Sequence, residues 1–500
     1  MTAAVADRVA SVMDRYEAVI GIEVHCQLRT ASKMFCGCST AYDGAAPNTR
    51  VCPVCLALPG SLPVINRLAV EFVISTGLAI EATIPARTQW ERKNYFYPDL
   101  PKGYQISQYA IPLAADGRLA IETSAGPFVV RITRAHLEED TAKLLHGDVA
   151  GESGSRTTLV DFNRAGTPLM EIVTEPEIRT AEQARRYAEE LRLLLRAIGV
   201  SDADMERGQM RVEANVSLRL RGTEPFGTRV EVKNMNSFRA VERAIDFEIE
   251  RQAAALDAGE PLVMETRGWD DGRQATYRMR AKETSDDYRY FPDPDLPPLR
   301  VDAAWIDGVR AFLPELPAAR RARYVALGLG AYDAAVIVAD PAMTMAFEAI
   351  SAAGSAPAKE VSNFVTGAHA RAVKDGGLNA LGTAGASSPA SIATLLSAIA
   401  SGQVSRPTGR DLLDRHLAEG TPAAELLDSA GPGPISDDPS LLAHIDAVIA
   451  ANPGAVADYR AGKPVAGFFV GRVMKATGGA ADAARVTTLV RERLEGEPSS

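Results

Sequence analysis

The stretch VIGIEVHCQL, residues 19–28, decides the fold class of this 500-residue chain, because from Ile20 onward its apolar and polar positions alternate. Side chains of a β-strand point alternately to the two faces of the sheet, so Glu23 and His25 share one face. The same alternation recurs in residues 211–220, which place Glu213 on the polar face, and in residues 230–233, which place Glu231 and Lys233 there. The pattern predicts an antiparallel sheet that is covered on one side only.

Two amphipathic helices are expected beside this sheet. Residues 180–198 begin with a capping box and end before a glycine, and a second helix follows Ser237 as its N-cap. The proline-rich run 291–298 marks a boundary, after which the chain becomes alanine-rich and helical. We therefore expect an α+β fold: an antiparallel-sheet domain over residues 1–298, an all-α helical domain over 299–403, and a small all-α domain over 404–500.

The composition fits a globular protein of the cytoplasm. Hydrophobic residues make up 46% of the chain, and no apolar run is long enough to cross a bilayer, so no membrane partner is expected. The chain has only five cysteines, which argues for a reducing compartment. A net charge of −10 argues against binding nucleic acid over the whole surface, although a local basic face is not excluded.

Four cysteines form a metal-binding pattern. Cys36 and Cys38 read C-x-C, and Cys52 and Cys55 read C-x-x-C after a single connecting loop. Two close thiol pairs of this kind are typical of a four-thiolate zinc site. The remaining cysteine, Cys26, falls on the apolar face of its strand, and a small core residue is the favoured interpretation over a nucleophile.

Carboxylates gather in several motifs. Residues 134–143 contain Glu138, Glu139 and Asp140, and residues 161–171 contain Asn163 and end in Glu171. Together with the acids of the strands and one histidine, they form a reasonable site for Mg²⁺, a cation that prefers oxygen ligands and accompanies nucleotide phosphates. Alternatively, each motif is a solvated strand face paired with lysine and arginine. The two interpretations differ in whether the fold brings the motifs together.

The run KNYFYPDLPKGYQISQ, residues 93–108, is too polar for a core strand. Its aromatic and amide side chains suit stacking on a base and hydrogen bonding to its edge. A surface loop whose tyrosines pack locally would have the same composition. The sequence contains neither a phosphate-binding P-loop nor a G-x-S-x-G nucleophile motif.

Long motifs in this order resemble the GatB/GatE family of tRNA amidotransferase subunits. They are GIEVH at 21–25, KNYFYPDLPKGYQISQ at 93–108, HLEED at 136–140, DFNRAGTPLMEIV at 161–173, VEVKNMNSF at 230–238 and DDYRYFPDPDL at 286–296. The C-terminal segment resembles the YqeY-type domain of that family. The resemblance covers nearly the whole chain and is weakest over residues 300–400.

The resemblance implies an ATP-dependent reaction on misacylated tRNA. The side-chain carboxylate of Glu-tRNA(Gln), Asp-tRNA(Asn) or both is phosphorylated, and ammonia then displaces phosphate. A separate glutaminase of the amidase family supplies the ammonia through a channel, and a small third protein completes a heterotrimer. The implied cofactors are ATP, Mg²⁺ and a structural Zn²⁺, and the C-terminal domain contacts tRNA.

The resemblance also assigns residues. It implies that His25, Glu139 and Glu171 bind Mg²⁺, with Glu138 in a supporting position. The catalytic set also includes Glu23, Glu213 and Glu231, of which Glu213 or Glu231 is a candidate proton acceptor for ammonia. The expected contacts to ATP or to the acceptor end of tRNA are Lys93, Asn94, Tyr95, Tyr104, Gln105, Ser107, Asn163 and Lys233.

A different class of function remains open from the sequence. The chain could be a zinc-containing tRNA-binding protein without catalysis, whose partner performs the chemistry. An RNA-binding surface is expected to be basic and aromatic, whereas a nucleotide site needs acids to hold a metal. The acid-rich strand faces favour the catalytic interpretation.

Overall fold

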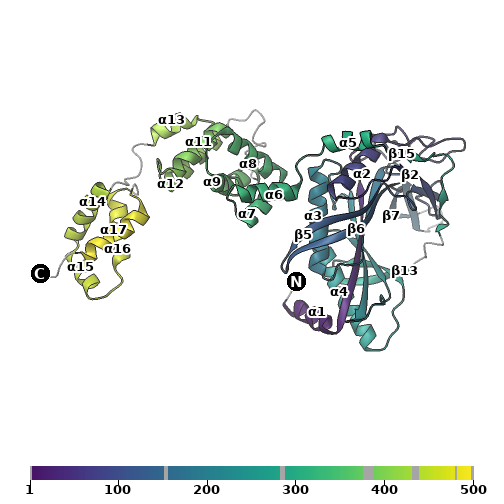
Figure 1. The fold of residues 1–500 in the computed structure, drawn as a ribbon, viewed down its shortest axis with the longest axis horizontal. Coiled ribbons are helices and arrows are strands. Elements are labelled where there is room, and N and C mark those ends of the chain that lie inside the picture. Colours follow the sequence, from purple (N-terminus) through teal and green to yellow (C-terminus); the bar gives the residue numbers. More distant parts are fainter. Residues whose placement is uncertain are drawn as a thin grey trace. The chain divides into compact units, whose positions relative to one another are not determined.

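The computed structural model describes residues 3–150, 156–281, 288–374, 388–430, 438–478 and 481–496. The chain forms two compact units, residues 1–317 and 318–500. Figure 1 shows the strands in the first unit and only helices in the second. The expected three-domain division, with borders after residues 298 and 403, stays a prediction.

Strand β1 (Tyr16–Gln27) lies in the middle of an eight-stranded sheet with the order β13-β12-β11-β10-β1-β9-β6-β5. The other strands are β5 (Ala114–Thr123), β6 (Gly126–Glu139), β9 (Pro168–Thr174), β10 (Met210–Leu220), β11 (Val230–Met235), β12 (Glu265–Asp270) and β13 (Ala275–Ala281). Both neighbours of β1 run antiparallel to it, with Glu23 opposite Glu213 on β10 and His25 opposite Glu171 on β9. The strand predicted from residues 19–28 is thus the one on which the sheet is centred.

The sheet contains one parallel pair, which the sequence pattern did not indicate. β11 and β12 run parallel, while the other neighbouring pairs are antiparallel. Helix α4 (Phe238–Asp257) carries the chain from the end of β11 back to the start of β12, the crossover that a parallel pair requires. The predicted α+β class with helical C-terminal parts is confirmed.

Three helices cover the apolar face of the sheet: α2 (Arg67–Ala79), α3 (Ala181–Ala197) and α4 (Figure 1). Helix α3 starts at the predicted capping box, in which Thr180 and Gln183 satisfy each other's backbone N–H groups. Its buried residues Tyr187, Leu191 and Leu195 pack in one core with Ile20 and Ile22 of β1. The opposite face of the sheet is left for the polar side chains.

Short elements surround the sheet. They are α1 (Ala3–Arg15), α5 (Ala303–Ala311), the strands β3 (Glu91–Asn94), β4 (Tyr104–Ser107) and β14 (Phe291–Pro292) of a three-stranded sheet, the pair β2 (Arg87–Thr88) and β15 (Leu299–Arg300), and the pair β7 (Lys143–Ala150) and β8 (Arg156–Asp161). Helix α5 belongs to the first unit, because Trp305 donates a hydrogen bond to Glu71 of α2 and Val309 joins the core.

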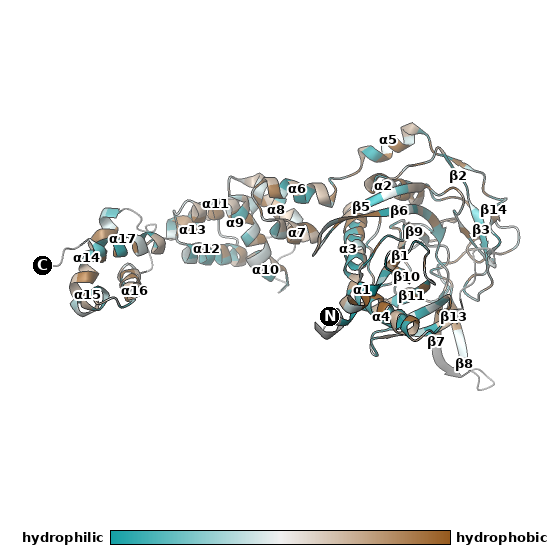
Figure 2. Cartoon of the chain, turned by 60° about the horizontal axis from the view of Figure 1, so that its bottom comes forward, coloured by the Kyte–Doolittle hydropathy of each residue, from teal (hydrophilic) through white to brown (hydrophobic). Residues whose placement is uncertain are grey.

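Helices joined by short turns and loops make up the described part of the second unit. Its elements are α6 (Pro317–Ala326), α7 (Ala331–Ala339), α8 (Pro341–Ala353), α9 (Ala358–Phe364), the π-helix η2 (Val365–His369), α10 (Ala370–Lys374), α11 (Pro389–Ala400), α12 (Arg406–Glu419), α13 (Ala423–Ser429), α14 (Asp438–Ala451), α15 (Pro453–Arg460), α16 (Ala466–Ala476) and α17 (Ala483–Glu495). Helices α14, α16 and α17 share a core around Leu441, Phe469 and Val490. Figure 2 shows apolar and polar residues mixed along these helices, as expected for helices buried on one side.

No single helix of the described residues is both long and apolar enough to cross a bilayer. Two bent helix pairs, α7 with α8 and α14 with α15, reach that length and composition only when each pair is taken together.

Candidate functional site: two acid clusters on one sheet face

The polar face of the sheet collects acids from five neighbouring strands. The registers place Glu23 of β1 opposite Glu213 of β10, and Glu231 of β11 opposite Asn215 of β10. On the other side of β1, Glu171 of β9 lies opposite both His25 of β1 and His136 of β6. Strand pairing therefore brings together acids that the sequence separates by more than a hundred residues.

The first cluster consists of His25, Glu138 and Glu171, each of which offers a ligand atom within 4.8 Å of the others. The Nε2 atom of His25 lies 3.6 Å from Glu138 and 3.5 Å from Glu171. His136 approaches the same carboxylate, with its Nε2 atom 3.4 Å from Glu171. These separations lie within ion-pair range but are longer than typical hydrogen bonds, so the contacts leave the groups incompletely satisfied.

Buried polar atoms in this cluster lack partners. The Oε2 atom of Glu138 and the Nδ1 atoms of His25 and His136 have no hydrogen-bond partner among the described residues. Because unsatisfied buried polar groups destabilise a fold, such groups at one place indicate a site for a ligand. A cation held by carboxylate oxygens and one imidazole would satisfy part of this set.

The protonation states respond to this crowding. Burial, together with the charge of Glu171, raises the pKa of Glu138. Burial alone would favour a neutral His25, but contact with Glu171 and the other carboxylates raises the pKa of His25 to about 9. Burial opposes ionisation of Glu171, yet His136 and His25 hold its pKa well below the usual range. In the protein alone, a protonated His25 compensates part of the negative charge.

The second cluster consists of Glu23, Glu213 and Glu231, again with ligand atoms within 4.8 Å of one another. Here the protein supplies its own cation, because the Nζ atom of Lys233 lies 2.7 Å from Glu213 and 3.8 Å from Glu231. Asn215 donates a hydrogen bond of 2.7 Å to Glu23, and Thr266 donates one of 2.7 Å to Glu231. The second cluster is thus better satisfied than the first.

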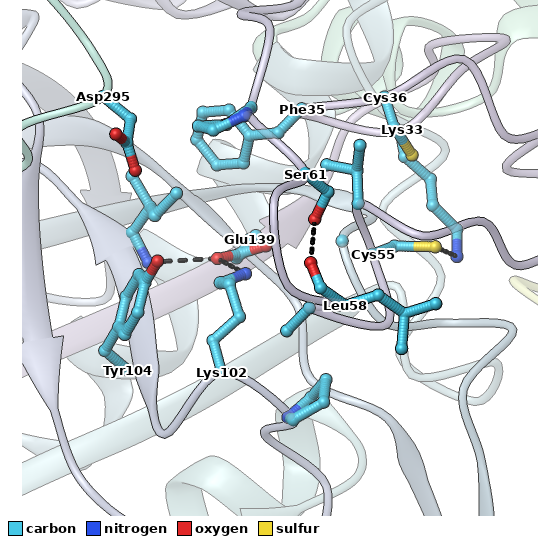
Figure 3. Close-up of a pocket in the computed structure, with 16 residues that line it drawn as sticks. Lys33, Phe35, Cys36, Cys55, Leu58, Ser61, Lys102, Tyr104, Glu139 and Asp295 are labelled. Atoms are coloured by element: carbon cyan, nitrogen blue, oxygen red, sulfur yellow. Dashed lines mark hydrogen bonds and ion pairs between the residues drawn. The ribbon is translucent and has the colours of Figure 1, made fainter.

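Glu139 does not join either cluster, although the resemblance assigned it to Mg²⁺. Neighbouring residues of a strand point to opposite faces, so Glu138 faces the acids and Glu139 faces away. Glu139 lines a cavity of about 200 Å³, and its carboxylate accepts the N–H of Ile106. Figure 3 shows this carboxylate paired with Lys102. Gln105 donates a hydrogen bond of 2.8 Å to the backbone carbonyl of Glu139. The acid that lies with His25 and Glu171 is thus Glu138, and not Glu139.

Lys93, an expected contact to ATP or the acceptor end of tRNA, lies close to the first cluster. Burial opposes its charge, but the charges of Glu138 and Glu171 raise its pKa far above that of a free lysine. Its ammonium lies 5.0 Å from the centre of the Tyr288 ring, and among the described residues it makes no hydrogen bond or ion pair. Tyr95 contacts the same Tyr288 ring edge-on at 6.1 Å. An anion that enters the site finds an unpaired ammonium here.

Other residues expected to contact ligands are engaged within the protein. Asn94 donates to the carbonyls of Tyr288 and Arg289, and Tyr104 lies under the guanidinium of Arg92 at 4.2 Å. Ser107 is buried in strand β4, and Asn163 is buried with hydrogen bonds to Arg50 N and Ala46 O. Their observed contacts hold loops in place.

The four predicted metal-binding cysteines do come together. The Sγ atoms of Cys36, Cys38, Cys52 and Cys55 lie within 4.8 Å of one another, and those of Cys52 and Cys55 are 3.9 Å apart. A tetrahedral site with Zn–S bonds of about 2.3 Å places its sulfurs about 3.8 Å apart, which matches this spacing. Contact with Cys36 lowers the pKa of Cys55 to about 4, whereas contact with Cys55 raises the pKa of Cys36 and burial raises that of Cys38 to about 11, so the metal-free site favours the thiolate at Cys55 and thiols at the other two.

Two residues of this region were missed in the sequence. His136 precedes Glu138 by two positions, so the alternation of β6 places both on the same face, and this signal was available. Lys102 pairs with Glu139 across a turn and strand, and no sequence spacing indicates that pair.

Comparisons with known proteins identify the family of the chain. Residues 18–307 match the family described as the GatB/GatE catalytic domain, and residues 345–494 match the GatB domain. Similar curated proteins are the aspartyl/glutamyl-tRNA(Asn/Gln) amidotransferase B subunits of Moorella thermoacetica (50% identical over 96% of this chain and 100% of the relative) and of an Anaeromyxobacter species (47% identical over 96% of this chain and 99% of the relative). With the sheet, its acids and these matches together, the chain belongs to the GatB/GatE family of tRNA amidotransferase subunits.

Proposed function

We propose that this chain catalyses the ATP-dependent amidation of Glu-tRNA(Gln), Asp-tRNA(Asn) or both. The similarity to proteins named as B subunits of aspartyl/glutamyl-tRNA(Asn/Gln) amidotransferases supports the class of substrate. The first acid cluster supports the chemistry, because the unsatisfied Glu138 oxygen, with Glu171 and the Nε2 atom of His25 beside it, suits a cation that accompanies a nucleotide. An RNA-binding surface alone has no need of such a cluster.

In this proposal Mg²⁺ is held by His25, Glu138 and Glu171, with Glu138 in place of Glu139. These residues fit a hard cation, since two of the three supply oxygen and Glu138 Oε2 lacks a partner. When bound, Mg²⁺ neutralises phosphate charge. His25 loses its proton to make room for the ion, and His136 keeps Glu171 oriented.

The reaction proceeds by two displacements, the first at the γ-phosphorus of ATP and the second at the acyl carbon of the tRNA-bound side chain. A carboxylate oxygen attacks the γ-phosphorus of ATP, ADP leaves, and an acyl phosphate forms. Ammonia then attacks the acyl carbon, phosphate leaves, and a proton is released. Lys93 and Lys233 bind the phosphate and carboxylate oxygens, and Glu213 or Glu231 accepts the proton.

The ammonia comes from a partner in this proposal. Cys26 does not suit a glutaminase nucleophile, because burial raises its pKa to about 12, so its thiol stays protonated and inert. We therefore expect the chain to work in a heterotrimer with a glutaminase of the amidase family and a small third protein, in the cytoplasm. We further propose that Zn²⁺ occupies the cysteine site and is structural, because four thiolates leave no coordination position for a substrate.

The test is conversion of Glu-tRNA(Gln) to Gln-tRNA(Gln) by the purified chain with ATP, MgCl₂ and ammonium chloride, alone and with the glutaminase and the small third protein. We expect product that depends on ATP and is lost in Glu138→Gln, while tRNA binding is unchanged. Full activity of Glu138→Gln would reject the metal site. No product under any condition, with tRNA binding intact, would instead favour a non-catalytic tRNA-binding role.

A further inference from the structure

Lys33 is a fully buried lysine beside the cysteine site. Its exposed fraction is 0%, and its Nζ atom lies 3.6 Å from Cys55 Sγ, 2.8 Å from Arg50 O and 3.4 Å from Phe162 O. Figure 3 shows the lysine ammonium directed at the Cys55 sulfur. Lysine is almost never fully buried unless it has a partner, so the site must supply one. Two carbonyl groups and a sulfur do so.

The charge of a zinc-bound cysteine site explains why a lysine is buried beside it. Zn²⁺ with four thiolates carries a net charge of −2, and burial of uncompensated charge is strongly unfavourable. The Lys33 ammonium reduces that charge to −1 and donates an N–H to the sulfur of one ligand. Groups that hydrogen-bond to metal ligands from outside the coordination sphere tune the affinity of the site.

The same lysine joins two segments of the chain. Arg50 precedes Cys52 in the cysteine loop, residues 36–55, whereas Phe162 begins the 162–166 turn. Asn163 strengthens the junction through hydrogen bonds to Arg50 N at 2.7 Å and Ala46 O at 2.8 Å. The turn leads directly into β9, which carries Glu171. The cysteine loop is therefore connected to the acid site through this turn.

Close packing fixes the turn against the lysine. Gly166 has a φ of +83°, and a side chain there would meet Lys33 Cδ at 3.5 Å and Cys55 Cβ at 3.6 Å. The backbone of Gly166 accepts the N–H of Met34 at 2.7 Å and donates to Asp140 O at 2.8 Å. Displacement of Lys33 therefore disturbs both the metal loop and the end of β6.

We propose that Lys33 is a positioning residue of the zinc site, which compensates the charge of the four thiolates and ties the cysteine loop to the 162–166 turn. Zinc then orders the turn that precedes the Glu171 strand. This inference rests on the proposed zinc occupancy and does not depend on the proposed amidation reaction.

The first test compares the zinc affinity of the full-length wild type, Lys33→Met and Lys102→Met by competition with a chromogenic chelator. Lys102 lines the same cavity but pairs with Glu139, so its substitution removes a nearby charge and no N–H···S contact. We expect Lys33→Met to bind zinc about 10- to 100-fold more weakly, the range for lost outer contacts to metal ligands. Lys102→Met is expected to stay within about threefold of the wild type on the same reasoning.

Cobalt substitution gives a second readout that a loss of folding does not mimic. The sulfur-to-cobalt charge-transfer band of Co²⁺-loaded protein is expected to shift in Lys33→Met and to remain in place in Lys102→Met, because only the first loses a donor to sulfur. Equal zinc affinity and an unchanged band in folded Lys33→Met would overturn the inference. Wild-type protein that binds no zinc would reject the proposed zinc occupancy itself.

Wild-type protein supplies the remaining test if Lys33→Met does not fold. Hydrogen exchange of the 162–166 turn and of the control turn between β5 and β6, residues 124–125, is measured before and after zinc removal. We expect faster exchange in the first turn only. Equal exchange in the 162–166 turn with and without zinc would contradict the coupling.

Discussion

The adjacent residues Glu138 and Glu139 are expected to respond oppositely to the same change from carboxylate to amide. Glu138 is buried among other acids, with one oxygen unpartnered, whereas Glu139 pairs with Lys102. In protein without Mg²⁺, the charge of Glu138 is unfavourable in the folded state, and Glu138→Gln removes it. The charge of Glu139 is favourable because it pairs with Lys102, and Glu139→Gln removes this ion pair.

The magnitudes follow from these surroundings. Glu138→Gln keeps a polar group at this position but removes its buried charge and the repulsion by Glu171, and the lost attraction to His25 offsets part of that gain. The raised pKa of Glu138 shows that the unfavourable contribution is larger, so Glu138→Gln should raise the free energy of unfolding by roughly 1 kcal/mol at neutral pH. Glu139→Gln should lower it by about 3 kcal/mol, the low end of the range for a broken buried pair, because the Lys102 side chain is 13% exposed.

Magnesium separates the two variants further. A ligand that binds only the folded state stabilises it, and at concentrations above Kd this stabilisation grows with the logarithm of the ratio of ligand concentration to Kd. The wild type and Glu139→Gln should therefore be stabilised by millimolar MgCl₂. Glu138→Gln should show little of this stabilisation, because it lacks the Glu138 carboxylate that is proposed to bind the ion.

The assay is denaturant unfolding of the zinc-loaded wild type and both variants, with and without MgCl₂ and without a chelator, so that zinc stays bound in both arms. The first unit is followed by tryptophan fluorescence, since all three tryptophans lie in it. The reasoning is refuted if Glu138→Gln is destabilised as strongly as Glu139→Gln, or if it keeps the full stabilisation by Mg²⁺.

Three further predictions concern pH, the cysteine site and the turn. Because the pKa of His25 is raised to about 9, the metal-free folded protein keeps a proton on His25 that the unfolded chain loses near pH 6.5. The free energy of unfolding should therefore fall as the pH rises from about 6.5 to 9, and urea titrations of His25→Gln should show a smaller fall. Cys38→Ser should lower the zinc content of purified protein below one atom per chain, as measured by mass spectrometry, whereas Cys26→Ser should leave it unchanged. Gly166→Ala should destabilise the chain by about 1–2 kcal/mol, because the positive φ of Gly166 is unfavourable for alanine. Gly37→Ala is the control, since a side chain at Gly37 meets no atom within 4 Å. Equal melting temperatures of Gly166→Ala and the wild type would contradict this prediction.

Local signals in the sequence were sufficient to predict the central strand β1 and the start of helix α3. Strict alternation placed Glu23 and His25 on the polar face of β1, and the capping box placed the start of α3 at Thr180. These features depend on neighbours one to four residues away, which sequence spacing records directly. The zinc-type cysteine spacing is local in the same sense, and the four sulfurs meet as predicted.

Features that depend on tertiary contacts were less accessible. The parallel pair β11 and β12 follows from the path of α4, which alternation does not encode. The choice between Glu138 and Glu139 required the register of β6, since one position reverses the face of a side chain. Lys33 has no local motif, and its role depends on a sulfur and two carbonyls that the fold brings to it.

The position of β1 has a consequence for biosynthesis. Its site residue Glu23 hydrogen-bonds to Asn215, 192 residues later in the chain. At elongation rates of about 5–20 residues per second, the nascent strand waits on the order of 10–40 s on the ribosome before this neighbour emerges. During that interval the backbone edge of β1 that will face β10 is unpaired and can pair with other strands. We therefore expect chaperones to remain bound to the nascent chain until β10 has been synthesised.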